Sequence, residues 1–227
     1  MEHVDVADLT SGKSSNGISI AKGRFEAFSD GVFAIAITLL VLEFRAPELA
    51  RVNDAAMTAA LLALSHQYLV YFASFATIGI MWFNHYALFH NVPHVSYGGL
   101  IANLALLMFV AFLPFPTLLI GRYGPLTSSV VYFGLTLLAI SICFNILWYV
   151  ATLGHGQRGS ITGFLRSRTA WNTVGFVVYA LGTLVAFLSP TSAIGLFACV
   201  ALYYMLPSSV RSTLEATASA HEGESTT

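Results

Sequence analysis

Charged side chains are scarce in this sequence of 227 residues: Asp, Glu, Lys and Arg make up 9% of it, whereas a soluble domain contains about 25%. The two cysteines, Cys143 and Cys199, lie in apolar stretches without the CxxC spacing of redox or zinc sites. Positive charge is not in excess either, because the formal net charge is −1. These shortages exclude a soluble globular enzyme, a nucleic-acid-binding protein and a disulfide-stabilised scaffold, and no metal site or cofactor is predicted.

What the sequence does contain is long uncharged segments. Thirteen of its 21 charged residues lie within the first 54 positions, and none lies in 57–121, 123–157 or 169–210. The mean hydropathy is +0.74. Since about 20 consecutive apolar residues span a bilayer as a helix, each gap holds one span or more. The sequence therefore predicts an all-α, polytopic membrane protein.

Turn-forming residues divide the uncharged segments into six predicted transmembrane helices. The first four cover residues 24–44, 60–89, 100–120 and 128–153, and the last two are separated by a turn at 189–192. Pro114 and Pro116 are expected to kink the third span. The predicted organisation is a cytoplasmic segment at 1–23, a membrane domain at 24–210 and a disordered cytoplasmic tail at 211–227.

The distribution of Lys and Arg predicts the orientation, because these residues favour cytoplasmic loops. With six spans, both termini lie on one side of the membrane. Seven basic residues fall on that side: Lys13, Lys22, Arg24, Arg158, Arg166, Arg168 and Arg211. Three fall on the other: Arg45, Arg51 and Arg122. The sequence therefore predicts a multi-pass protein with both termini in the cytoplasm.

The first predicted helix is unusual because its uncharged part, residues 31–42, is short. Twelve residues make about 18 Å of helix, whereas the hydrocarbon core is about 30 Å thick. Either this helix does not span the membrane, or Asp30, with or without Glu26, lies at membrane depth, where ionisable residues usually serve a function. In the simpler reading, Asp30 caps a helix that begins at the interface. The candidate partners for Asp30 are Arg24 and polar residues of the next two spans: Trp82, Asn84, His85 and Asn103.

Helical spacing places Gly31, Ile35, Thr38 and Leu42 in one stripe, with Asp30 about 140° away from Ile35. If this stripe faced a pore, Asp30 would face its own subunit. Two simpler readings remain open at this point. Thr38 can donate a hydrogen bond to the carbonyl four residues earlier, and Ile35 and Leu42 can serve ordinary helix packing or lipid contact.

The run Arg24-x-x-x-Phe28-Ser29-Asp30, followed by apolar residues up to Glu43, resembles the signature of the endolysosomal transmembrane potassium channels and their bacterial homologues. Two further motifs agree with this resemblance: Trp82-Phe-Asn-His85 and Asn103 followed by Leu113-Pro114-Phe115-Pro116-Thr117. The specific motifs lie within residues 24–117. A single six-helix unit resembles the prokaryotic form, because the animal proteins contain two such units.

The resemblance implies a moderately potassium-selective channel in a bacterial plasma membrane, with potassium ions and lipids as partners. It implies a homotetramer whose first helices line a central pore. Ile35 would form the hydrophobic constriction, Leu42 would extend it, and Thr38 would favour potassium. It also implies a structural lock behind the pore, formed by the signature residues and the second and third spans: Arg24, Phe28, Ser29, Asp30, Trp82, His85 and Asn103.

Two other classes of function compete with a channel. A proton-linked transporter would use Asp30, Glu26 and His85 as a relay, and a membrane scaffold would conduct no ions. A membrane enzyme is disfavoured, since no Ser-His-Asp set or carboxylate pair is identifiable.

Overall fold

The computed structural model describes residues 22–90, 92, 94–153 and 170–205, and every regular element in these segments is a helix. The predicted all-α fold is confirmed. The terminal segments predicted at 1–23 and 211–227 lie outside the described residues, apart from Lys22 and Gly23. The helices are α1 (Lys22–Leu39), η2 (Leu40–Glu43), α2 (Asp54–Ala63), α3 (Ser65–His90), α4 (Tyr97–Phe112), α5 (Pro114–Tyr123), α6 (Thr127–Leu153), α8 (Ala170–Val185) and α9 (Pro190–Met205).

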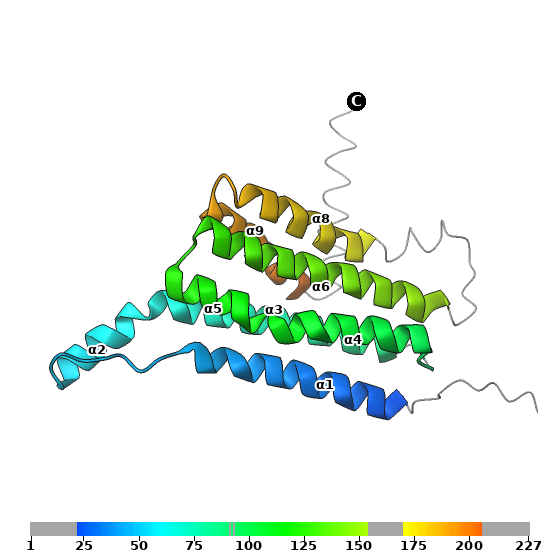
Figure 1. Cartoon of the computed structure of the whole chain (residues 1–227), viewed down its shortest axis with the longest axis horizontal. Coiled ribbons are helices and arrows are strands. Elements are labelled where there is room, and N and C mark those ends of the chain that lie inside the picture. Colours follow the sequence, from blue (N-terminus) through cyan, green and yellow to red (C-terminus); the bar gives the residue numbers. More distant parts are fainter. Residues whose placement is uncertain (1–21, 91, 93, 154–169, 206–227) are drawn as a thin grey trace, which may run out of the picture.

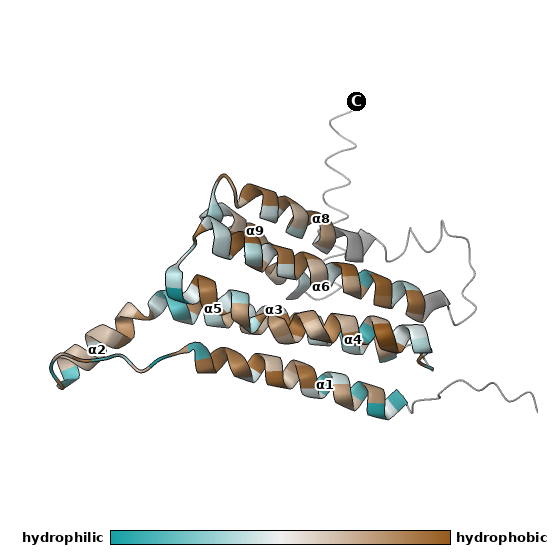
Figure 2. Cartoon of the chain, viewed as in Figure 1, coloured by the Kyte–Doolittle hydropathy of each residue, from teal (hydrophilic) through white to brown (hydrophobic). Residues whose placement is uncertain are grey.

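Three helical segments of the described chain are long and apolar enough to cross a membrane: Lys22–Glu43, Tyr97–Tyr123 and Thr127–Ala151. Helices α2 and α3 form a fourth candidate, although they are bent by 48° relative to each other. Helices α8 and α9 are also apolar but shorter, and apolar residues cover most of the long helices (Figure 2). The polytopic character is therefore confirmed, while the count of six crossings stays a prediction.

The long helices run side by side in a bundle, with α1 at one edge and α8 and α9 at the other (Figure 1). Helix α1 packs against α3 and α4, and α4 packs in turn against α6. Helix α6 contacts α8, and α9 completes the bundle by packing against α8 and α3. Helix α2 projects beyond the bundle (Figure 1). The edge position of α1 leaves one of its faces without cover from the other described helices.

The second predicted span, 60–89, falls on two helices in the structure. Helix α2 ends at Ala63 and α3 begins at Ser65, with a bend of 48° between them that the sequence did not predict. The side chain of Asn53 caps α2 by accepting a hydrogen bond from the backbone N–H of Ala56 (2.8 Å), so the apolar run at 60–63 belongs to a helix of its own. In the third span the helix is interrupted next to the prolines that were predicted to kink it, because α4 ends at Phe112 and Pro114 begins α5.

Candidate functional site on the first helix

Helix α1 and the following η2 have two opposite faces. The buried face consists of residues at helical spacing: Phe25, Ser29, Phe33, Ala36 and Leu40. On this side α1 packs against α3 and α4, and η2 packs against α3 and α5. The exposed face carries the stripe predicted from the sequence, with Gly31 and Thr38 exposed, Ile35 60% exposed and Leu42 72% exposed. The described helices of the chain therefore leave the stripe uncovered, although it is mostly apolar.

The winding of this helix changes before the stripe ends. The α-helix stops at Leu39, and the next turn, Leu40–Glu43, is a 3-10 helix, which has three residues per turn in place of 3.6. The predicted stripe assumed a continuous α-helix up to Leu42. The tighter turn rotates the last side chains, but Leu40 is still buried and Leu42 is still exposed on the other side.

The hydroxyl group of Thr38 donates a hydrogen bond to the backbone carbonyl of Ile35 (2.9 Å). The sequence-based alternative of a bond within the helix is thus present, although the acceptor lies three residues earlier and not four. A hydroxyl that donates its only proton keeps its oxygen lone pairs available. On this exposed face, the Thr38 oxygen can accept a further hydrogen bond or contact a cation.

A chain of hydrogen bonds joins the buried face of α1 to α4 and α3. The side-chain amide of Asn103 on α4 donates to the Ser29 hydroxyl oxygen (2.9 Å). The ring nitrogen Nε2 of His85 on α3 donates to the Asn103 Oδ1 atom (2.8 Å). All three side chains are buried, and the Ser29 hydroxyl donates to the Phe25 carbonyl (3.0 Å). Three residues of the predicted lock therefore form one buried network.

Three phenylalanine rings surround the His85 imidazole, and the sequence reasoning missed them. The ring centroids of Phe89, Phe33 and Phe25 lie 4.8, 5.5 and 6.2 Å from that of His85. Phe25 and Phe33 are eight residues apart, with Ser29 midway, so the same helical spacing that defined the exposed stripe could have identified this buried face. The apolar enclosure excludes water from the His85–Asn103–Ser29 network.

Asp30 takes part in a separate contact at the edge of the bundle. Its Oδ1 atom accepts a hydrogen bond from the indole N–H of Trp82 (2.8 Å), and both side chains are exposed in the single chain. Trp82 also stacks on Tyr86 with ring centroids 6.2 Å apart. The structure thus pairs Asp30 with one of its predicted partners, but it does not place Asp30 in the buried network.

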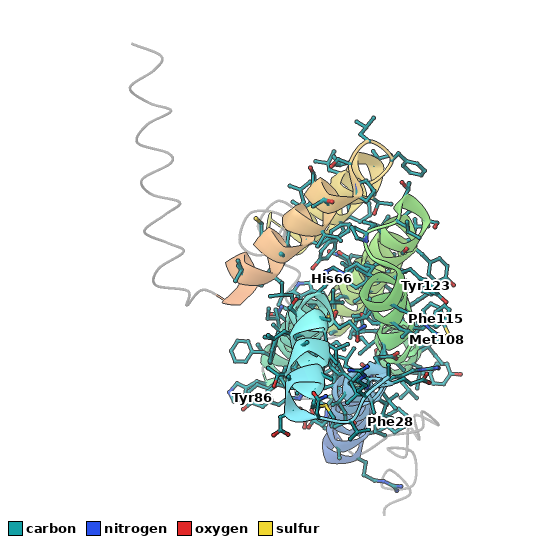
Figure 3. All side chains as sticks on the ribbon, turned by 90° about the vertical axis from the view of Figure 1, so that its left-hand side faces the viewer. Phe28, His66, Tyr86, Met108, Phe115 and Tyr123 are labelled. Atoms are coloured by element: carbon teal, nitrogen blue, oxygen red, sulfur yellow. The ribbon has the colours of Figure 1, made fainter. Side chains whose placement is uncertain are left out.

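Arg24 and Phe28, the two remaining residues of the predicted lock, lie outside the buried network. Phe28 is 55% exposed and lies on the side of the bundle remote from α8 and α9 (Figure 3). Arg24 is exposed and makes no hydrogen bond or ion pair with any residue that the structure describes, whereas its neighbour Lys22 pairs with Glu26 (3.6 Å). Within one chain, Arg24 and Phe28 are therefore surface residues.

Comparison with known proteins places this site in context. The family profile of the endosomal/lysosomal potassium channel TMEM175 matches residues 24–114. A potassium channel of Chamaesiphon minutus is 37% identical over 82% of this chain and 94% of its own length. The crystal structure of a lysosomal potassium-selective channel TMEM175 homolog from that organism superposes with a TM-score of 0.70 at 35% identity, covering 81% of this chain and 95% of that one.

The eukaryotic relatives match a smaller part. The endosomal/lysosomal proton channel TMEM175 of Mus musculus is 42% identical over 101 residues, which are 42% of this chain and 20% of the mouse protein.

Proposed function

Since this chain belongs to the TMEM175 family, we propose that it is a potassium-permeable channel of a bacterial plasma membrane and has no enzymatic role. Relatives that match it over nearly their whole length are named potassium channels. The observation that carries the proposal is the exposed, mostly apolar stripe of α1, which includes Ile35, Thr38 and Leu42. A helix at the edge of its own bundle is available to line a pathway between subunits.

Four copies arranged around one axis would bring their α1 stripes together. Closed rotational symmetry is the usual arrangement of identical subunits, and one pore-lining helix per chain suits a homotetramer. In this arrangement both termini are cytoplasmic, which places Arg45 and Arg122 outside. Both arginines line one cavity, which supports their location at the same end of the bundle.

The proposed pathway has a hydrophobic constriction at Ile35 and a polar ring at Thr38. Isoleucine provides no ligand to replace the hydration shell of an ion, and such a constriction can close by dewetting. The Thr38 hydroxyl donates its proton to the Ile35 carbonyl, so its oxygen lone pairs are available for an ion one turn along the helix. Ile35 then acts as the gate, with Leu42 extending the apolar lining, and Thr38 contributes to selectivity.

The buried network behind the stripe serves as the positioning device of the pore helix. Hydrogen bonds are directional, so the bonds from Asn103 to Ser29 and from His85 to Asn103 hold α1 in one rotation about its axis. A rotated α1 would turn Ile35 and Thr38 out of the pathway. The buried network of Ser29, Asn103 and His85 therefore contributes to conduction indirectly.

The experiment that tests this proposal is reconstitution into liposomes with a potassium gradient, followed by planar-bilayer recording. We expect Ile35→Asn to raise the potassium current about tenfold or more, since it hydrates the constriction and lowers the barrier. Thr38→Ala should shift the reversal potential toward that of a non-selective cation pathway.

Matched controls are available on the same helices. Val41→Asn makes the same kind of change at an exposed position off the stripe, and Thr77→Ala removes a hydroxyl that bonds to its own helix on α3; both should leave currents and reversal potential unchanged. Currents and reversal potentials that do not change in Ile35→Asn and Thr38→Ala would contradict the proposal. No flux under any condition would indicate a scaffold.

Proton transport is the second candidate, because the eukaryotic relatives are named proton channels. A relay through Asp30, Glu26 and His85 would give saturable, coupled transport that Asp30→Asn abolishes. In the described residues, the hydrogen bonds and ion pair of these groups go to three other side chains, namely Trp82, Lys22 and Asn103. A pH-sensitive dye inside the same liposomes separates the two candidates.

A further inference from the structure

A cavity of about 230 Å³ lies where the end of the first span meets α3 and α5. It is many times larger than the 10–15 Å³, on the order of one probe sphere, that a single water molecule needs. Buried Leu40 contributes to its wall, whereas Leu42 is exposed on the other side of the same turn. The cavity is therefore distinct from the proposed conduction pathway.

Three charged residues line this cavity: Glu43, Arg45 and Arg122. Charged residues are rare in this chain, so three around one cavity is an unusual concentration. None of them forms an ion pair within the part of the chain that the structure describes, where the ion pair found joins Lys22 and Glu26. The cavity lining thus contains two cationic residues and one anionic residue that have no charged partner among the described residues.

The rest of the wall is largely apolar, with a few neutral polar groups. Phe44, Val70 and Leu118 form part of the apolar surface, and Gln67 and Tyr71 add an amide and a phenol group. A ligand that fits this wall must carry charge at one end and apolar groups at the other. Small ions and sugars lack the apolar part, and a plain hydrocarbon lacks the charge.

The position of the cavity along the helices selects among amphipathic ligands. Glu43 is the last residue of one helical segment that is long and apolar enough to cross a membrane, and Arg122 lies one residue before the end of another. These segment ends lie at the level where hydrocarbon gives way to head groups, and arginine side chains near helix ends reach toward that layer. Hydrophilic residues are concentrated at these helix ends (Figure 2).

We propose that this cavity binds the head group of a phospholipid with a primary amine, of the phosphatidylethanolamine type. The phosphate binds between the Arg45 and Arg122 guanidinium groups, which are suited to phosphate oxygens. The ammonium group binds the Glu43 carboxylate, and the acyl chains follow the apolar wall toward the bilayer. The two arginines thus face the one negatively charged group of the lipid, and the single carboxylate faces its one positively charged group.

Two other ligand classes fit less well. A metal cation would meet two arginines and a single carboxylate, and the described residues contain no group of three or more His, Cys, Asp or Glu side chains that could hold a metal ion. An anionic lipid such as phosphatidylglycerol would satisfy the arginines but leave the Glu43 carboxylate beside a phosphate without a cation. Glu43 is therefore the residue that determines the preference for an amine.

The test is native mass spectrometry of the full chain with phosphatidylethanolamine, phosphatidylglycerol or phosphatidylcholine of identical acyl chains. The wild-type protein should retain the ethanolamine lipid about tenfold more than the choline lipid, which has no N–H group to donate to Glu43. Arg45→Gln and Arg122→Gln should each lower retention of the ethanolamine lipid about tenfold. Glu43→Gln should reverse the preference in favour of phosphatidylglycerol.

Arg51→Gln is the matched control, because Arg51 is exposed on the same segment between α1 and α2 and does not line the cavity; its lipid retention should equal that of the wild type. A soluble head group, glycerophosphoethanolamine, should not displace the lipid at equal concentration, which separates a lipid site from a free-phosphate site. Equal retention of the three lipids, or equal loss in Arg51→Gln and Arg122→Gln, would overturn the proposal. Binding here does not depend on whether the chain conducts ions.

Discussion

The helices of the first and second halves of the bundle are held together in different ways. In the first half, α1, α3 and α4 are joined by side-chain hydrogen bonds between helices, centred on Asn103. In the second half, α6, α8 and α9 meet at close range around the Phe197 ring, where a Cβ atom added to Gly134 or Gly182 would overlap this ring. The described hydrogen bonds of Thr136 and Thr183 stay within their own helices.

The difference indicates which interactions fix the packing of each half. In a bilayer, lipid tails are as apolar as the helices, so little hydrophobic force brings helices together. Shape complementarity around small residues sets the distance between α6, α8 and α9. Directional polar bonds additionally set the rotation of α1, which decides the residues that its exposed face presents. The family profile covers residues 24–114, which is the half with the polar network.

The largest effect on stability is expected from a substitution that adds volume between the closely packed helices of the second half. Gly182→Ala places a methyl group against the Phe197 ring, which is only 5% exposed, and overpacking of this kind costs about 1–3 kcal/mol. The free energy of unfolding, measured by SDS titration of the reconstituted protein, should fall by about this amount. Gly79→Ala on α3 is the control, because a Cβ atom there meets nothing within 4 Å, and it should not destabilise the protein.

A smaller loss of stability is expected when a buried hydrogen-bonding side chain of the first half is replaced by an apolar one. Asn103→Leu retains the approximate size of the side chain but leaves the His85 N–H group without its acceptor, at a cost of about 1–2 kcal/mol. The same SDS titration measures this loss of stability, and the reversal potential of the reconstituted protein should change too, since α1 loses its rotational restraint. Thr183→Val, which removes a hydroxyl bonded within α8, should change neither. Equal effects of the two substitutions would mean that the two halves do not differ as described.

The smallest effect is expected at the exposed edge of the first half. Trp82→Phe removes the N–H group that binds Asp30, and an exposed pair of this kind contributes less than about 1 kcal/mol. Asp30→Asn retains an acceptor oxygen and should be closer to the wild type in the same titration. A loss at Trp82 larger than at Asn103 would show that the edge contact, and not the buried network, holds α1.

Much of the fold could be predicted because it depends on local composition. The break at Pro114 and the end of α3 near His90 follow from residues next to them in the chain. The start of the second span could not be placed, since the apolar run continues through Ala60 while the helix axis bends after Ala63. Hydropathy measures the length of an apolar run, and it carries no information about a change of direction within it.

The candidate site, like the fold, could be predicted only in part. Helical spacing alone grouped Ile35, Thr38 and Leu42 on one face, and the structure leaves all three exposed. Helical spacing did not predict that the signature residues belong to two separate hydrogen-bonded groups. Ser29 and Asp30 are adjacent, yet one joins the buried network and the other binds Trp82 at the edge, because adjacent helical residues point about 100° apart.

The sequence by itself determined that this protein is a membrane helix bundle and which residues share a face of its first helix, because both properties follow from the order of residues along one chain. The tertiary structure alone decided that Asn103 connects Ser29 to His85 and that Arg45 and Arg122 line one cavity with Glu43. Asn103 lies 74 residues from Ser29, and Arg122 lies far along the chain from Glu43 and Arg45, so these contacts depend on how the helices pack. The scarce charges therefore mark two different places: the start of α1, where the signature residues lie, and the far end of the same span, where the proposed lipid site lies.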